Sequence, residues 1–292
     1  MIKKNIKSIQ LDQKGSHNVS FSEWSSEASQ QETILPRQYI YCVHRLTGNS
    51  SDFDFLAESL IKDNENRVVI CIDIPGRGKS DFLKDPSNYH VEFYAWDMVQ
   101  FIEKISYDKD IDFIGTSMGG LIGMVLYQLP KKFKIRNLIL NDIGPQVSTQ
   151  SMNNIANYVQ KVNVFDTREE SEIYLQNTHK GFGELTSLQW KFLFDNCIIE
   201  KNSKFIFHYD PMISIRFTQV EQDLNLWEIY NKIDCKIFIL RGKESEILSK
   251  QVYNSMLELS NNKGIEFDNV GHAPMLFSSE QIEPIIQFIN QV

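Results

Sequence analysis

The sequence predicts an α/β fold in which helices cover both faces of an eight-stranded, mostly parallel sheet. Three observations lead to this expectation. Short runs rich in β-branched and aromatic residues recur along the chain. From the third run onward, segments with helical periodicity separate these runs, and such alternation is typical of parallel strands. One long stretch in the second half interrupts the alternation with helical patterns.

The eight predicted strands are short and mostly apolar. The first two flank a turn-like segment at 12–16, so we expect them to form a hairpin. The predicted strands are 6–11, 18–24, 39–43, 68–72, 111–114, 135–140, 236–240 and 264–267.

The predicted helices fall into two groups. Those between strands of the main sheet are 51–62, 91–105, 121–129 and 251–259. Those in the interrupted stretch are 152–162, 168–179, 187–199 and 224–233. We interpret residues 145–234 as a helical cap inserted above the sheet, and residues 1–144 with 235–292 as the core.

Composition excludes several classes of protein. The chain has 292 residues, of which 42% are hydrophobic and 23% charged, a balance typical of a folded domain with a large core rather than of disorder. Its 30 basic and 38 acidic residues give a net charge of -8, which argues against a nucleic-acid partner. The four cysteines are scattered and form no CxxC pair, which argues against a disulfide framework or a structural zinc site.

The chain lacks the signals expected of a secreted or membrane-spanning protein. Its basic start is not followed by the apolar stretch that a signal peptide requires. The most apolar uncharged stretch, 113–130, contains polar residues and glycines that fit a buried strand, turn and helix better than a membrane span. We therefore expect a cytoplasmic protein.

The sharpest motif surrounds Ser117. Gly115-Thr-Ser117-Met-Gly119 satisfies G-x-S-x-G, with an apolar strand before it and a helical pattern after it. A sharp strand-to-helix turn presents the serine hydroxyl above the sheet, and the flanking glycines let the chains pass each other. Ser117 is therefore the candidate nucleophile.

A serine nucleophile needs a base and an acid that orients the base. His272 lies in a loop after the last strand, where the chain order Ser, acid, His places the base. Glu246, after strand 236–240, is the first choice for the acid. Asp142, after strand 135–140, is the rival, and Glu244 is a weaker third candidate.

An oxyanion hole requires two backbone N–H donors. Met118 follows the nucleophile, and Leu46 lies in the loop after the third strand, so these two are the expected donors. His44 is expected to brace this loop by hydrogen bonding. His179, at the end of a helical pattern, is expected to be solvated.

Taken together, these motifs resemble the α/β-hydrolase fold family, most closely its bacterial single-domain esterase and lactonase branch. The segments that carry the resemblance are His44-Arg-Leu-Thr-Gly-Asn49, Asp73-Ile-Pro-Gly-Arg-Gly-Lys-Ser80, Gly115-Thr-Ser-Met-Gly-Gly120, Asn141-Asp-Ile-Gly-Pro145, Leu240-Arg-Gly242 and Gly271-His-Ala-Pro274. The resemblance implies a cap after the sixth strand, a Ser–acid–His triad, and no cofactor or metal.

The sequence departs from the family pattern at two positions. Arg45 stands where relatives usually carry glycine, so either the oxyanion loop is displaced or the guanidinium lines the entrance and binds substrates with a carboxylate. Glu246 stands where the family has aspartate, which keeps Asp142 open as the acid.

These features predict a serine hydrolase that cleaves a small carboxylic ester, thioester or lactone through an acyl-enzyme on Ser117. A carbon–carbon bond hydrolase with the same triad is the alternative among enzymes. A non-catalytic protein that binds a small molecule on the same fold is the alternative from another class.

Overall fold

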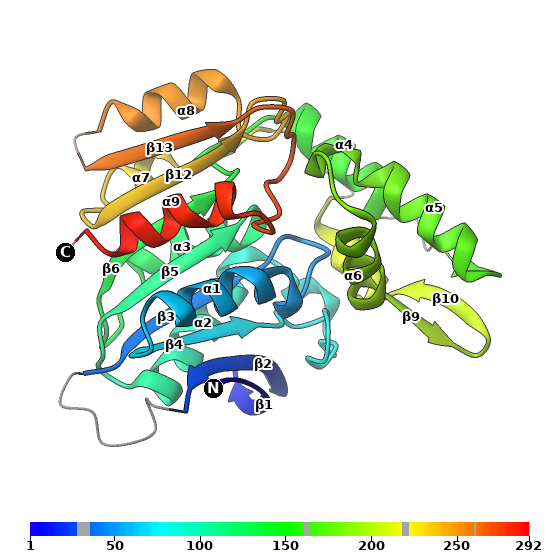
Figure 1. The fold of residues 1–292 in the computed structure, drawn as a ribbon, viewed down its shortest axis with the longest axis horizontal. Coiled ribbons are helices and arrows are strands. Elements are labelled where there is room, and N and C mark those ends of the chain that lie inside the picture. Colours follow the sequence, from blue (N-terminus) through cyan, green and yellow to red (C-terminus); the bar gives the residue numbers. More distant parts are fainter. Residues whose placement is uncertain (28–35, 160–163, 218–221, 260, 292) are drawn as a thin grey trace.

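The computed structural model describes residues 1–291 except 28–35, 160–163, 218–221 and 260. An eight-stranded sheet with the order β1-β2-β4-β3-β5-β6-β12-β13 forms the centre of the molecule (Figure 1). Its strands are β1 (Ile2–Asp12), β2 (Ser16–Ser26), β3 (Gln38–Val43), β4 (Arg67–Ile72), β5 (Ile111–Thr116), β6 (Ile135–Asn141), β12 (Lys236–Gly242) and β13 (Asn262–Phe267). All eight predicted strands are thereby confirmed.

The sheet is mostly parallel, as predicted. β1 and β2 form the expected antiparallel hairpin, and β2 also pairs antiparallel with β4. The pairs from β4 through β13 are parallel. The carboxyl ends of the parallel strands therefore meet at one edge, where loops from different strands converge.

Helices cover both faces of the sheet (Figure 1). Alternate residues of each strand point to opposite faces: in β3, Tyr41 joins one hydrophobic core and Cys42 the other. α2 (Val91–Ser106), α3 (Met118–Gln128) and α8 (Lys250–Leu257) pack on the first face. α1 (Asp54–Asp63) and α9 (Ser279–Ile289) pack on the second. The sequence did not predict α9, which contains Pro284.

Residues between β6 and β12 form α4, α5 and α6, which lie beyond one end of the sheet in Figure 1, and the short α7 beside the core. The helices of this segment are α4 (Thr149–Val159), α5 (Arg168–Thr178), α6 (Ser187–Cys197) and α7 (Trp227–Tyr230). The last part of the helix predicted at 152–162 falls outside the described residues. The division into core and cap at 145 and 234 stays a prediction.

The segment also contains short strands that the sequence did not predict. Three short strands, β8 (Val164–Phe165), β9 (Ile198–Lys201) and β10 (Lys204–Phe207), form a small antiparallel sheet. Another two, β7 (Gln146–Val147) and β11 (Leu224–Asn225), pair with each other. Strands of two to four residues are too short to show an alternating pattern in the sequence.

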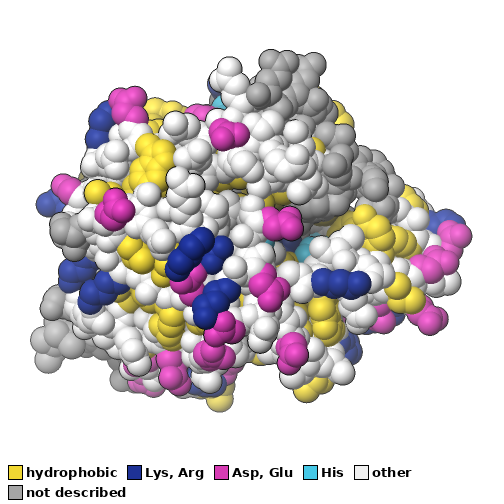
Figure 2. Space-filling model, turned by 90° about the horizontal axis from the view of Figure 1, so that it is seen from above, with side chains coloured by type: hydrophobic (Ala, Val, Ile, Leu, Met, Phe, Trp, Pro, Cys, Tyr) yellow, Lys and Arg dark blue, Asp and Glu magenta, His cyan; other side chains and the backbone are white. Residues whose placement is uncertain are grey.

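Charged side chains of both signs lie interspersed on the face drawn in Figure 2. On this face no patch of a single sign stands out. In the described part of the chain, no helix is long and apolar enough to cross a bilayer.

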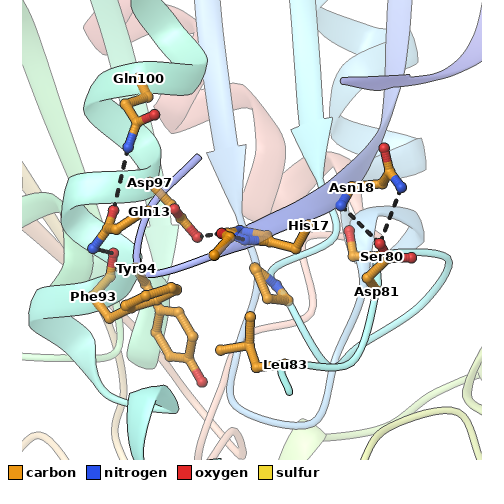
Figure 3. Close-up of polar contacts among 12 residues, drawn as sticks. Gln13, His17, Asn18, Ser80, Asp81, Leu83, Phe93, Tyr94, Asp97 and Gln100 are labelled. Atoms are coloured by element: carbon orange, nitrogen blue, oxygen red, sulfur yellow. Dashed lines mark hydrogen bonds and ion pairs between the residues drawn. The ribbon is translucent and has the colours of Figure 1, made fainter. Parts of the chain in front are cut away.

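A buried ion pair fastens the β1–β2 hairpin to α2 (Figure 3). His17 Nε2 lies 2.8 Å from the Asp97 carboxylate, and both side chains are buried. Burial by itself lowers the pKa of His17, but hydrogen bonding to Asp97 and the charge of Asp97 outweigh it, so the pKa of His17 is raised above 6.5. The folded protein therefore holds a proton that the unfolded chain releases near neutral pH.

We expect this pair to make the stability of the protein depend on pH. A histidine with a raised pKa in the folded state contributes stability that is fully present below pH 6.5 and is lost as the pH rises through the folded-state pKa. The difference in unfolding free energy between wild type and His17→Gln should therefore shrink with rising pH across that window. Urea unfolding of both proteins between pH 5.5 and 8.5 measures it; a constant difference would contradict the assignment.

Candidate active site

The serine of G-x-S-x-G occupies a strained turn between β5 and α3. Ser117 has φ 53° and ψ -115°, a conformation that a residue with a side chain rarely adopts. Side chains at Gly115 and Gly119 would collide with neighbouring backbone, at Gly119 and at Val43 respectively. The glycines thus allow the close approach of β5, α3 and β3 that this turn requires, as the sequence predicted.

His272 connects the serine to a carboxylate. Its Nε2 lies 2.8 Å from Ser117 Oγ, and its Nδ1 lies 2.7 Å from Asp142 Oδ2. The three residues come from the turn after β5, the turn after β6 and the loop after β13. Since these three strands are parallel, their carboxyl ends bring the three side chains together.

Asp142 is held in place from two directions. It is completely buried, with φ 56°, directly after β6. The Gly242 N–H donates to Oδ1 at 2.9 Å, and the Ser245 hydroxyl donates to Oδ2 at 2.6 Å. Gly242 ends β12 and Ser245 lies in the loop that follows, the loop on which the sequence analysis had placed the acid.

The preference for Glu246 as the partner of His272 is therefore wrong. The Glu246 side chain is exposed and lines a cavity beside the serine, while its backbone carbonyl accepts a hydrogen bond from the Ser151 hydroxyl. Glu244 is exposed in the same cavity. The loop after β12 presents Ser245 to the acid, and its two glutamates point toward the cavity.

The loop after β3 is braced by buried polar groups. His44 Nε2 accepts from the Ile74 N–H at 3.0 Å, and Nδ1 lies 2.6 Å from the Arg45 carbonyl. Burial lowers the pKa of His44 to about 3, so the ring is neutral. The bracing role expected for His44 is confirmed.

Arg77 is a buried residue whose contacts with the site the sequence did not reveal. Its guanidinium donates to the Leu46 carbonyl and to the Tyr94 hydroxyl, and Nη2 lies 3.6 Å from the Met118 sulfur. It also lies over the rings of Tyr89 and Tyr94. Arg77 thus joins the two residues expected to supply the oxyanion donors.

Arg45 is buried and does not reach solvent. Its Nε lies 3.4 Å from the Asp52 carboxylate, Nη1 donates to the Thr47 hydroxyl at 2.9 Å, and the guanidinium packs over the Phe182 ring. Burial raises the pKa of the Asp52 carboxyl beside Arg45. A contact between Arg45 and a substrate carboxylate stays a prediction.

Two cavities meet at Ser117. One, of about 320 Å³, is called here the polar cavity; among the residues that line it are Arg45, Asn154, Thr178, His179, Glu246 and His272. The other, of about 360 Å³, is called the apolar cavity; among the residues that line it are Met118, Leu121, Val125, Val147, Met152 and Leu224. Both are also lined by Leu46, Ser117, Ile155 and Ile247.

His179 is the C-cap residue of α5, is partly exposed, and lies in the wall of the polar cavity. Its ring packs against Phe182 at 4.9 Å between centroids. Burial and the nearby charge of Arg45 lower the pKa of His179 to about 3, so the cavity contains a neutral imidazole there. Among the described residues, no three His, Cys, Asp or Glu side chains gather to hold a metal ion.

Comparison with known proteins agrees with this geometry. The model of the alpha/beta hydrolase fold family matches residues 39–279. The chain belongs to the α/β-hydrolase fold family. A 3-hydroxybutyrate-oligomer hydrolase of Cupriavidus necator is 34% identical over 289 residues, which cover 94% of each chain.

Solved α/β-hydrolase structures superimpose along nearly the whole chain. A structure from Rickettsia typhi has a TM-score of 0.88 and 30% identity, and covers 99% of both chains. An alpha/beta hydrolase from Novosphingobium aromaticivorans has a TM-score of 0.85 and 26% identity, and covers 98% of this chain and 99% of its own. Both matches include the segment between β6 and β12.

Proposed function

We propose that this α/β-hydrolase is a serine esterase with Ser117 as nucleophile, His272 as base and Asp142 as the acid that orients His272. The observation that carries the proposal is the continuous contact from Ser117 Oγ through the His272 ring to a buried carboxylate. A thioester or lactone offers the same acyl carbon to this nucleophile and belongs to the same proposed chemistry.

The reaction follows from these contacts. Ser117 Oγ attacks the ester carbonyl carbon while its proton passes to His272 Nε2. The backbone N–H groups of Leu46 and Met118 are the proposed donors to the negative oxygen that forms. The carbon–oxygen bond to the alcohol then breaks, and His272 returns its proton to the leaving oxygen. A water molecule, deprotonated by His272, hydrolyses the acyl-enzyme and restores Ser117.

The substrate class we propose is a short linear oligoester of hydroxy acids, such as oligomers of 3-hydroxybutyrate. Support comes from the Cupriavidus necator relative, whose name states that activity and which aligns along almost the whole chain. A nucleophile between two cavities of moderate size also suits a chain with an acyl part and an alcohol part on either side of the bond.

We expect the purified protein to release 3-hydroxybutyrate from its dimer and trimer, with Ser117→Ala as the inactive control. Product analysis by liquid chromatography with mass spectrometry measures this release. Wild-type protein that hydrolyses p-nitrophenyl butyrate but leaves the oligomers intact would contradict the substrate class. Wild-type protein that hydrolyses no ester and is not labelled at Ser117 by a fluorophosphonate would contradict the esterase itself.

A further inference from the structure

We propose that the apolar cavity takes the acyl chain of the ester and the polar cavity takes the leaving alcohol. This assignment rests on the proposed esterase function and states how the ester lies in the site. It assigns one of the two cavities to each side of the ester bond.

The position of His272 supplies the first argument. The leaving oxygen must accept the proton that His272 Nε2 carries, so it has to lie within hydrogen-bond reach of that nitrogen. Among the described lining residues, His272 borders the polar cavity alone. An alcohol that departs toward His272 therefore leaves through the polar cavity.

The acyl group remains on Ser117 after the alcohol has left and needs a different space. Met118, the proposed oxyanion donor that follows the nucleophile, borders the apolar cavity. An acyl chain that extends past Met118 enters a space lined by Leu121 and Val125 of α3 and by Met152 of α4. Burial of each further methylene in this space strengthens the binding of a longer acyl chain.

The chemistry of the polar cavity suits an alcohol that carries oxygen atoms. Asn154 and Thr178 offer an amide and a hydroxyl that donate to ester or hydroxyl oxygens. Glu244 and Glu246 add carboxylates at this cavity, and Arg45 lies there beside Asp52. An alcohol that carries oxygen atoms thus fits this cavity, as the hydroxy-acid leaving group of the proposed oligoester does.

Two variants that each fill one cavity test the assignment. Leu121→Trp occupies the apolar cavity and Asn154→Trp occupies the polar one. Leu188→Trp, at an exposed position on α6 away from both cavities, is the matched control. kcat/KM is measured for two ester series, one in which the acyl group varies and one in which the alcohol varies.

In the acyl series, p-nitrophenyl acetate is compared with p-nitrophenyl octanoate. Leu121→Trp should lower the octanoate-to-acetate ratio of kcat/KM by about tenfold or more, and Asn154→Trp should leave it unchanged. In the alcohol series, butyryl esters of ethanol and of ethyl 3-hydroxybutyrate are compared. Asn154→Trp should lower the preference for the second, and Leu121→Trp should not.

The outcomes separate this assignment from the esterase function. The assignment would be overturned, with the esterase function intact, if Leu121→Trp changed only the alcohol preference and Asn154→Trp only the acyl preference. It would also be overturned if neither variant changed either ratio of kcat/KM. A wild type inactive on every ester would overturn both. Circular dichroism checks folding, and if Leu121→Trp fails to fold, Met152→Trp fills the same cavity from α4 and is held to the same result.

Discussion

Replacement of Asp142 by asparagine is expected to lower kcat by about 10⁴-fold while the protein remains folded. The Asp142 carboxylate accepts from His272 Nδ1, so it selects the tautomer whose Nε2 can take the serine proton, and it stabilises the imidazolium that forms. An asparagine amide keeps the shape but can present an N–H to Nδ1, which favours the wrong tautomer. KM should change much less than kcat.

Glu246→Gln is the matched control, since it also removes one carboxylate beside the site. Its side chain lines the polar cavity without orienting His272, so kcat should stay close to that of the wild type. Steady-state kinetics with p-nitrophenyl butyrate, at the pH where the wild type is most active, compare the two variants. A large loss of kcat in Glu246→Gln together with a small loss in Asp142→Asn would contradict the proposal and favour Glu246 as the acid.

Gly119→Ala is expected to lower the free energy of unfolding by about 3 kcal/mol or more. A Cβ at Gly119 would collide with the Val43 carbonyl group, at 2.6 Å from its carbon. Backbone cannot rotate away as a side chain can, so either α3 or the end of β3 must move. The same displacement would shift the loop that carries Leu46 and reduce activity in whatever fraction folds.

Gly181→Ala provides the comparison for this substitution. A Cβ at Gly181 meets its nearest atom at 3.4 Å, an ordinary contact, so the unfolding free energy should stay within about 0.5 kcal/mol of the wild type. Urea unfolding followed by circular dichroism measures both variants. Equal stability of Gly119→Ala and Gly181→Ala would contradict the close packing of β3 against α3.

The sheet could be predicted because its causes are local. Each strand of the sheet shows its β-branched and aromatic run in the sequence, and the helices between strands show their own period. The elements that were missed lacked such a signal. β8 and β7 have only two residues each, and the polar positions and Pro284 of α9 obscure its apolar face, which becomes clear only when it packs beside α1.

The sequence by itself predicted Ser117 and His272 as the nucleophile and the base of the proposed site. A strained turn at Ser117 depends on neighbouring glycines, and the position of His272 follows from the order of elements along the chain. Only the tertiary structure placed Asp142, and not Glu246, beside His272 and revealed the two cavities. Asp142 and Glu246 both follow strands that end at the same edge of the sheet, so spacing cannot separate them. The difference lies in Gly242 and Ser245, at the end of the neighbouring strand β12 and just after it, which donate hydrogen bonds to Asp142 from roughly 100 residues away. Glu246 instead lines the cavity.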